Sequence, residues 1–182
     1  DLKHSPEELT ERVFSTFPGL CQLLPSSERF TSFNVYDSTK WPDGRCGARQ
    51  DLLDQSKVRE KFLAPGDNRF VLIAGVNKET VTSTGLDGSN FNFFVTNEGD
   101  GTVPLALAQL PDVRATYYVE ESHGSLANNS KVIQAVKDLL SLGTTDALPT
   151  TWSPQRAAPR TLSEEDIRKL VPDDASAVRG AA

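Results

Sequence analysis

The middle of the sequence alternates between strand and helix patterns, and this alternation limits the fold more than any other feature. Residues 70–76 (FVLIAGV) form a continuous apolar run bounded by turn residues, which predicts a strand buried on both faces. Residues 105–110 predict a short helix, residues 115–119 a further strand, and residues 130–142 a helix with Gly143 as its C-cap. Strands and helices in this order predict the α/β fold class.

Further elements are predicted on either side of this pattern. Residues 80–84 and 91–96 flank a glycine-containing turn, which predicts an antiparallel hairpin or excursion. After residue 143 the composition changes, because residues 144–160 hold prolines among Thr, Ser and Ala. They predict an extended linker that either wraps the surface or is disordered. Residues 163–166 (SEED) then predict the start of a small helix.

The N-terminal part predicts helices and turns. Residues 5–8 (SPEE) combine an N-cap Ser with Pro and Glu, which predicts a helix from there to the Pro-Gly pair at 18–19. Residues 20–25 predict a short buried turn and residues 33–37 a brief extended piece. Residues 50–63 return to helical spacing, and we expect that helix to cover a sheet.

Composition excludes several classes of function. The 182 residues carry a formal net charge of −6 and are 37% hydrophobic, which is enough for a single core in one domain. Basic residues are scattered among acidic ones, so we do not expect nucleic acid as a partner. No apolar run approaches the roughly 18 residues of a membrane span, and no stretch is typical of a signal peptide.

Cysteine and methionine usage adds three expectations. Cys21 and Cys46 are too few for a disulfide framework and lack the Cys or His neighbours of a zinc site, so we expect no metal and no cofactor. Two free thiols in a reducing compartment are favoured over a single disulfide, which the sequence leaves open. Because the sequence contains no methionine, we expect it to be part of a longer translation product.

Asp100 and His123 are the candidate catalytic residues, because each follows a predicted strand. Successive strand ends lie on the same edge of a sheet, so we expect the two side chains to be neighbours. An acid beside a histidine fixes the tautomer of a general-base imidazole. Taken singly, an ordinary Asp-Gly turn and a loop histidine that caps the next helix are the simpler explanations. The pair in this order favours two members of a catalytic triad.

Three segments resemble lipases and acyltransferases of the lecithin:cholesterol acyltransferase type, which are α/β-hydrolases. Residues 17–25 (FPGLCQLLP) resemble the family's FPS-x-YQLLP stretch, and residues 98–104 match its EGDGTVP motif. Residues 122–132 resemble its histidine region. The likeness covers roughly residues 14–142. It implies Asp100 as the triad acid and His123 as the triad base, and it places residues 37–41 in a cap over the substrate cleft.

The sequence departs from this family in one respect that decides its chemistry. The family's nucleophile is the Ser of a G-x-S-x-G elbow, and no glycine here is followed two places later by Ser. The resemblance therefore implies the C-terminal portion of an α/β-hydrolase sheet, with flanking helices and part of a cap. On this interpretation residues 1–143 belong to the hydrolase domain, with the cap and helical region at about 1–65, and residues 144–182 form a linker and tail.

Cys46 is a weak alternative nucleophile. Residues 44–48 (GRCGA) have the outline of an elbow, and Cys46, Asp100 and His123 follow the chain order of a hydrolase triad. An elbow needs a buried strand directly before it, whereas residues 40–43 (KWPD) predict a turn. We therefore expect that this chain alone does not hydrolyse esters.

The leading hypothesis is the C-terminal part of a serine esterase or lipase-like hydrolase or acyltransferase. Its partners would be an acyl ester or lipid-like substrate and the missing N-terminal part of the same protein. A non-catalytic interaction module on a hydrolase-like scaffold is the alternative. We also expect self-association, because a partial sheet leaves a strand edge unpaired. The sharpest prediction is a distance of roughly 2.6–3.2 Å from an Asp100 oxygen to a ring nitrogen of His123, with the other nitrogen facing an open cleft.

Overall fold

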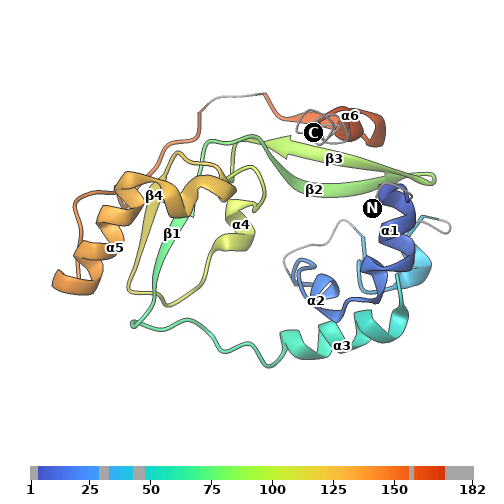
Figure 1. The fold of residues 1–182 in the computed structure, drawn as a ribbon, viewed down its shortest axis with the longest axis horizontal. Coiled ribbons are helices and arrows are strands. Elements are labelled where there is room, and N and C mark those ends of the chain that lie inside the picture. Colours follow the sequence, from blue (N-terminus) through green and yellow to red (C-terminus); the bar gives the residue numbers. More distant parts are fainter. Residues whose placement is uncertain (1–3, 29–32, 43–47, 156–157, 171–182) are drawn as a thin grey trace, which may run out of the picture.

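The computed structural model of the chain describes residues 4–28, 33–42, 48–155 and 158–170. It is a mixed α/β structure with two small sheets (Figure 1). A parallel pair joins β1 (Val71–Gly75) to β4 (Ala115–Val119). An antiparallel sheet has the order β2 (Thr80–Asp87), β3 (Asn90–Thr96) and β5 (Arg160–Ser163). The predicted α/β class is confirmed at this level.

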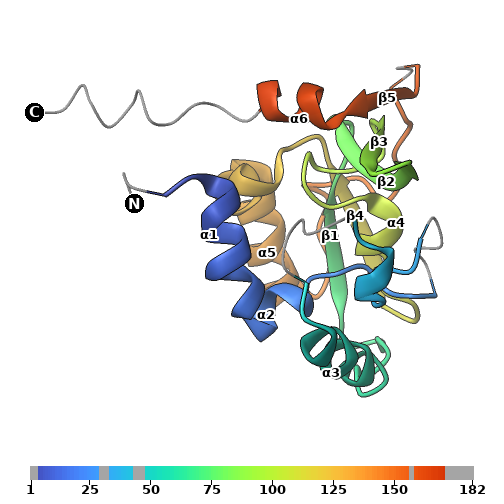
Figure 2. The same cartoon turned by 90° about the vertical axis from the view of Figure 1, so that its right-hand side faces the viewer.

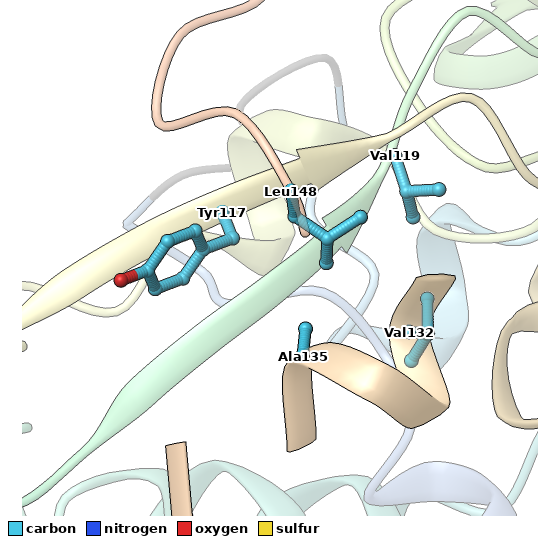
Figure 3. Close-up of a cluster of buried hydrophobic side chains, with 5 residues drawn as sticks. All are labelled: Tyr117, Val119, Val132, Ala135 and Leu148. Atoms are coloured by element: carbon cyan, nitrogen blue, oxygen red, sulfur yellow. The ribbon is translucent and has the colours of Figure 1, made fainter. Parts of the chain in front are cut away.

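Helices cover both faces of the parallel pair. Residues alternate between the faces, so that Tyr117 and Val119 point towards α5 (Ser130–Leu142), whereas Ala74 and Tyr118 lie on the side of α4 (Leu105–Ala108). Figure 3 shows the α5 side, where the side chains of the helix meet those of β4 and the linker. The prediction of a strand buried on both faces is confirmed for the end of β1, but its first three residues are only half-buried.

Helix α5 begins and ends at the predicted residues. The Oδ1 of Asn129 accepts hydrogen bonds from the amides of Lys131 and Val132, which satisfies donors that the first turn leaves free. Gly143 ends the helix at φ 78°, a left-handed conformation that costs glycine little. Apolar spacing and both caps are therefore encoded locally.

The predicted hairpin is present as β2 and β3, and the C-terminal part adds a strand that the sequence analysis missed. β5 pairs antiparallel with β3, with Leu162 opposite Phe93. It was missed because Leu162 is its only apolar residue. The helix α6 (Glu164–Leu170) follows directly, capped by Ser163, whose Oγ accepts from the Asp166 amide. In Figure 2 this sheet and α6 lie above the parallel pair.

The linker after α5 wraps the surface over residues 144–155. Leu148 is buried in the α5 core, and the amide of Tyr118 donates to the carbonyl of Pro149 (2.9 Å). Through this bond the irregular backbone of the linker covers the outer edge of β4. The sequence allowed a linker that wraps the surface or one that is disordered, and the described part of this segment wraps the surface.

The N-terminal helices differ from the predictions. Helix α1 (Pro6–Arg12) begins at the predicted capping box but ends early, and is followed by the 3-10 turn η1 (Phe14–Thr16). Pro18, expected to end a helix, instead begins α2 (Pro18–Cys21), where its missing N–H costs nothing. The turn at residues 20–25 is not buried, since Leu23 is 79% exposed.

Two expectations for residues 33–60 also differ from the structure. Residues 33–37 form turns that bury Val35 and Tyr36, not an extended piece, and lead into the 3-10 turn η2 (Ser38–Lys40). Helix α3 (Gln50–Glu60) packs its Leu53 against these residues and does not cover a sheet. Helical spacing predicted the helix but not its packing partner. A helix can bury its apolar face against a small apolar cluster as well as against a sheet, so the spacing does not distinguish the two.

Candidate active site

Asp100 and His123 are in direct contact. The Oδ2 of Asp100 lies 2.9 Å from the Nδ1 of His123, within the predicted range. The backbones are also joined, because the amide of His123 donates to the carbonyl of Asp100 (2.8 Å). The predicted contact is confirmed, and the two loops are connected at two points.

The route by which Asp100 reaches this position differs from the expectation. The strand before it, β3, belongs to the antiparallel sheet, and the neighbour of β4 is β1. The hairpin is an excursion whose return segment closes beside the end of β1. There the amide of Asn77 donates to the carbonyl of Asn97 (3.1 Å), and Lys78 forms a parallel bridge with Asp100. The prediction of neighbouring side chains is right, but its choice of strand is wrong.

Small residues and a buried hydroxyl allow this close approach. A Cβ on Gly75 would lie 2.5 Å from the Cβ of Asp100, and one on Gly99 would lie 2.6 Å from the Oγ1 of Thr80. Thr80 is almost completely buried; its hydroxyl accepts from the Gly101 amide (2.9 Å) and donates to the Lys78 carbonyl (2.8 Å). Gly101 has φ 92°, which favours glycine. The turn that presents Asp100 is fixed by these contacts.

The carboxylate of Asp100 is buried but fully hydrogen-bonded. Its side chain is 7% exposed, and its Oδ1 accepts from the amides of Val103 (2.7 Å) and Thr102 (3.0 Å). Burial raises the pKa of Asp100, but the bonds from Val103, His123 and Thr102 outweigh burial and hold that pKa below its ordinary value. Asp100 is therefore an anion at neutral pH and can only accept hydrogen bonds.

The ionised carboxylate determines the tautomer of His123. A hydrogen bond to an acceptor requires the proton on Nδ1, which leaves Nε2 with a free lone pair in the neutral ring. The His123 side chain is 53% exposed, and no residue in the described ranges hydrogen-bonds to Nε2. A ring in this state can take a proton from a hydroxyl at Nε2.

The expected cleft around Nε2 is not found among the principal cavities. A cavity of about 530 Å³ is lined by Glu98, Leu105, Ala106, Gln109 and Trp152, and one of about 540 Å³ lies between Tyr118, Lys131 and Trp152. His123 lines neither of them. Its ring faces solvent, so the described residues provide one wall of a site and not an enclosed pocket.

Two residues missed by the sequence analysis hold the loop that carries His123. Glu121 accepts from the Ser122 amide through Oε1 (2.8 Å) and from the Nδ2 of Asn129 through Oε2 (3.0 Å). Asn129 was identifiable from sequence only as the residue before a helix. Its bond to Glu121 spans the loop and could not be predicted from local pattern.

The two cysteines complete the set of residues considered from the sequence. Cys46 lies outside the described residues. Cys21 is half-buried, and burial, with a contribution from Asp51, raises the pKa of its thiol. Within the described ranges no group of His, Cys, Asp and Glu could hold a metal ion. Among those residues no helix is long and apolar enough to cross a membrane.

Comparisons with models of protein families, with curated proteins and with solved structures each found no match.

Proposed function

We propose that Asp100 and His123 are the acid and base of a Ser-His-Asp hydrolase that acts on acyl esters. The observation that carries this proposal is the hydrogen bond from Nδ1 of His123 to a buried, ionised carboxylate, with Nε2 left exposed. A histidine that only caps a helix would not require an anion held by two backbone amides. That arrangement stabilises a positive charge on the ring, which is the need of a general base.

The reaction requires a serine that these 182 residues do not provide in an elbow. Its hydroxyl proton moves to Nε2 of His123 as its oxygen attacks the ester carbonyl. Asp100 stabilises the resulting imidazolium while Nδ1 keeps its proton. The imidazolium then protonates the departing alcohol, which leaves an acyl-enzyme that water or a second alcohol cleaves by the reverse sequence. We propose that the serine and the oxyanion amides come from residues outside this sequence.

The resemblance to the lecithin:cholesterol acyltransferase type supports this proposal. Its EGDGTVP motif contains the aspartate that bonds His123, and its histidine region contains the partner. A parallel strand pair with helices on both faces is also compatible with the C-terminal portion of an α/β-hydrolase sheet. On this proposal residues 37–41 belong to a cap.

The test uses the full-length product of the reading frame that encodes these residues. With a nitrophenyl ester, we expect kcat/KM to fall by roughly 10⁴-fold in Asp100→Asn and by more in His123→Ala. His4→Gln is the matched control, because His4 is the other histidine and is exposed. Full activity in His123→Ala would overturn the proposal, whereas a full-length protein that does not turn over the ester would favour the interaction module.

The isolated chain gives a second test. We expect no turnover of the ester, because His123 needs a hydroxyl within reach and oxyanion donors around the carbonyl. Turnover that disappears in Cys46→Ala would contradict this expectation and assign the nucleophile to Cys46.

A further inference from the structure

The loop between β4 and α5 carries His123, and a single side-chain bridge joins its two ends. Glu121 stands two residues after β4, and Asn129 directly precedes α5. The bond from Nδ2 of Asn129 to Oε2 of Glu121 (3.0 Å) closes the loop around the 3-10 turn η3 (His123–Asn128). The bond between Glu121 and Asn129 therefore holds the two ends of this loop together.

The same two side chains attach the loop to its surroundings. Asn129 uses its Oδ1 to cap α5 and its Nδ2 to bind Glu121, so both ends of its amide are used. Glu121 uses one oxygen for Asn129 and the other for the Ser122 amide, directly before His123. The position of the His123 backbone is thereby set by the helix on one side and by β4 on the other.

The charge on Glu121 suits this role. The bond from Asn129, followed by the bond from the Ser122 amide, lowers the pKa of Glu121 below its ordinary value, so the carboxylate stays ionised as a double acceptor. The Ser122 hydroxyl also donates to Oε1 of Glu121 (3.3 Å), and Lys78 contributes a smaller attraction. In the described part of the chain neither Glu121 nor Asn129 hydrogen-bonds to the imidazole ring, so any effect on catalysis acts through the loop.

We propose that Glu121 and Asn129 are positioning residues that hold His123 in register with Asp100 and thereby maintain the Nδ1–H tautomer. This inference rests on the proposed function, because the tautomer matters only to a general base. Without the bridge, the loop retains the backbone bond from His123 to Asp100 but loses the restraint between β4 and α5. The ring then samples positions in which Nδ1 has no acceptor.

The test exchanges the two polar groups. In Glu121→Gln only one side-chain oxygen remains, so residue 121 cannot accept from both Asn129 and the Ser122 amide, and one of the two bonds is lost. Adding Asn129→Asp restores a donor and an acceptor with the polarity reversed, and the second oxygen of the new carboxylate remains free to cap α5. The double variant also keeps the net charge of the pair.

The readout is the tautomer of His123 by imidazole ¹H–¹⁵N correlation spectra near neutral pH. The His4→Gln background leaves His123 as the only histidine in the chain. We expect the wild-type loop to show protonated Nδ1 and bare Nε2. Glu121→Gln loses that single-tautomer signal, and the double variant regains it. A contribution to stability alone would change Tm and leave the signal unchanged.

A second variant and a control variant separate loss of the bridge from a general effect on α5. Asn129→Ser keeps a good N-cap but is too short to replace the amide bond to Glu121, so it loses the signal with little harm to α5. Asp138→Ala removes a comparable contact on the same helix, with Gln134 (2.7 Å) and Thr145 (2.8 Å), and retains the signal.

The outcomes separate the two proposals. If the wild-type chain lacks the Nδ1–H tautomer, the proposed catalytic pair fails. If the wild-type chain shows it and both Glu121→Gln and Asn129→Ser keep it, the pair stands and the positioning role is overturned.

Discussion

Gly75 determines how closely Asp100 can approach the end of β1. A Cβ there would lie 2.5 Å from the Cβ of Asp100 and 2.7 Å from the carbonyl oxygen of Glu121, and the latter is backbone that cannot rotate away. We expect Gly75→Ala to cost about 1–3 kcal/mol of unfolding free energy through overpacking. Gly124→Ala is the control, since nothing lies within 4 Å of its Cβ position. Equal stability of the two variants in urea would show that Asp100 shifts freely.

The pKa of Asp100 predicts a pH dependence of stability. Its folded-state pKa lies below the ordinary value of about 3.9, so the ionised form contributes stability that is fully present above that pH. This contribution is lost as the pH falls through the folded-state pKa. We expect the difference in unfolding free energy between wild type and Asp100→Asn to shrink as the pH falls below about 4. A difference that does not change below that pH would contradict the hydrogen-bonded carboxylate.

Sequence could identify Asp100 and His123 but not the residues that hold them. The pair stands out because each follows a strand and belongs to a recognisable motif. The role of Thr80 depends on a bond to Gly101, and that of Glu121 on a bond to Asn129, both across intervening structure. Nothing in the local pattern distinguishes those residues from ordinary polar positions. Contacts between segments far apart in sequence require the fold.

Local sequence signals predicted the helices that have caps. They failed for elements whose bounds or formation depend on contacts with neighbouring elements. Helix α5 was predicted to the residue because its apolar spacing and Gly143 agree. The strand β5 was missed because its pairing with β3 supplies a stability that four residues with one apolar side chain do not signal. Helix α1 ends earlier than its apolar spacing suggests, since the chain turns at Val13 to begin η1.

Asn77 fastens the linker to the end of β1. It is buried at φ 59°; its Nδ2 donates to Glu120 (2.7 Å) and to the Ser153 carbonyl (3.2 Å), and its Oδ1 accepts from the Gln155 amide (2.9 Å). These bonds take the place of a neighbouring strand. Gln155 adds a further contact there, because its Nε2 donates to Oε2 of Glu120 (3.1 Å).

We expect Asn77→Gly to lose about 1–3 kcal/mol and to expose residues 153–155 to proteases, because the linker bonds disappear while the backbone conformation is kept. Asn77→Ala loses roughly 1 kcal/mol more, since alanine resists positive φ. Urea denaturation and limited proteolysis measure the two effects. Wild-type protease resistance in Asn77→Gly would mean that the linker is held by its apolar contacts, such as Leu148.

The whole molecule distributes its apolar residues over separate clusters rather than one core. Tyr117 and Leu148 belong to the cluster under α5, Ala74 and Leu105 to the one beside α4, and Tyr36 and Leu53 to the N-terminal helices. The hydrophobic fraction predicted a single core, and that expectation is wrong, because composition carries no information on how the apolar residues are divided. Figure 1 shows the parallel pair and the helices α1–α3 as distinct parts joined by the segment that leads from α3 into β1.

In the described part of the chain, one edge of the parallel pair has no strand partner, and one face of α5 has no packing partner. The outer edge of β4 is covered by the linker, whereas β1 has no second neighbour in its sheet. On α5, Ile133, Val136 and Leu140 lie at the spacing of one helical face and are exposed, with Leu140 at 83%. This α5 face lies about 100° around the helix from Val132, Ala135 and Leu139, which pack against the sheet.

We expect the α5 face to bind its counterpart on a second copy of the chain, because a shared two-fold contact lets each copy cover the other's apolar residues. Sedimentation velocity over a range of concentrations measures the association. Leu140→Glu places a charge in the contact and shifts the species towards the 19.9 kDa monomer. Phe62→Glu is the control, because it removes an equally exposed apolar side chain next to α3. A wild-type chain that stays monomeric at every concentration contradicts self-association, and equal effects of the two variants place the contact elsewhere.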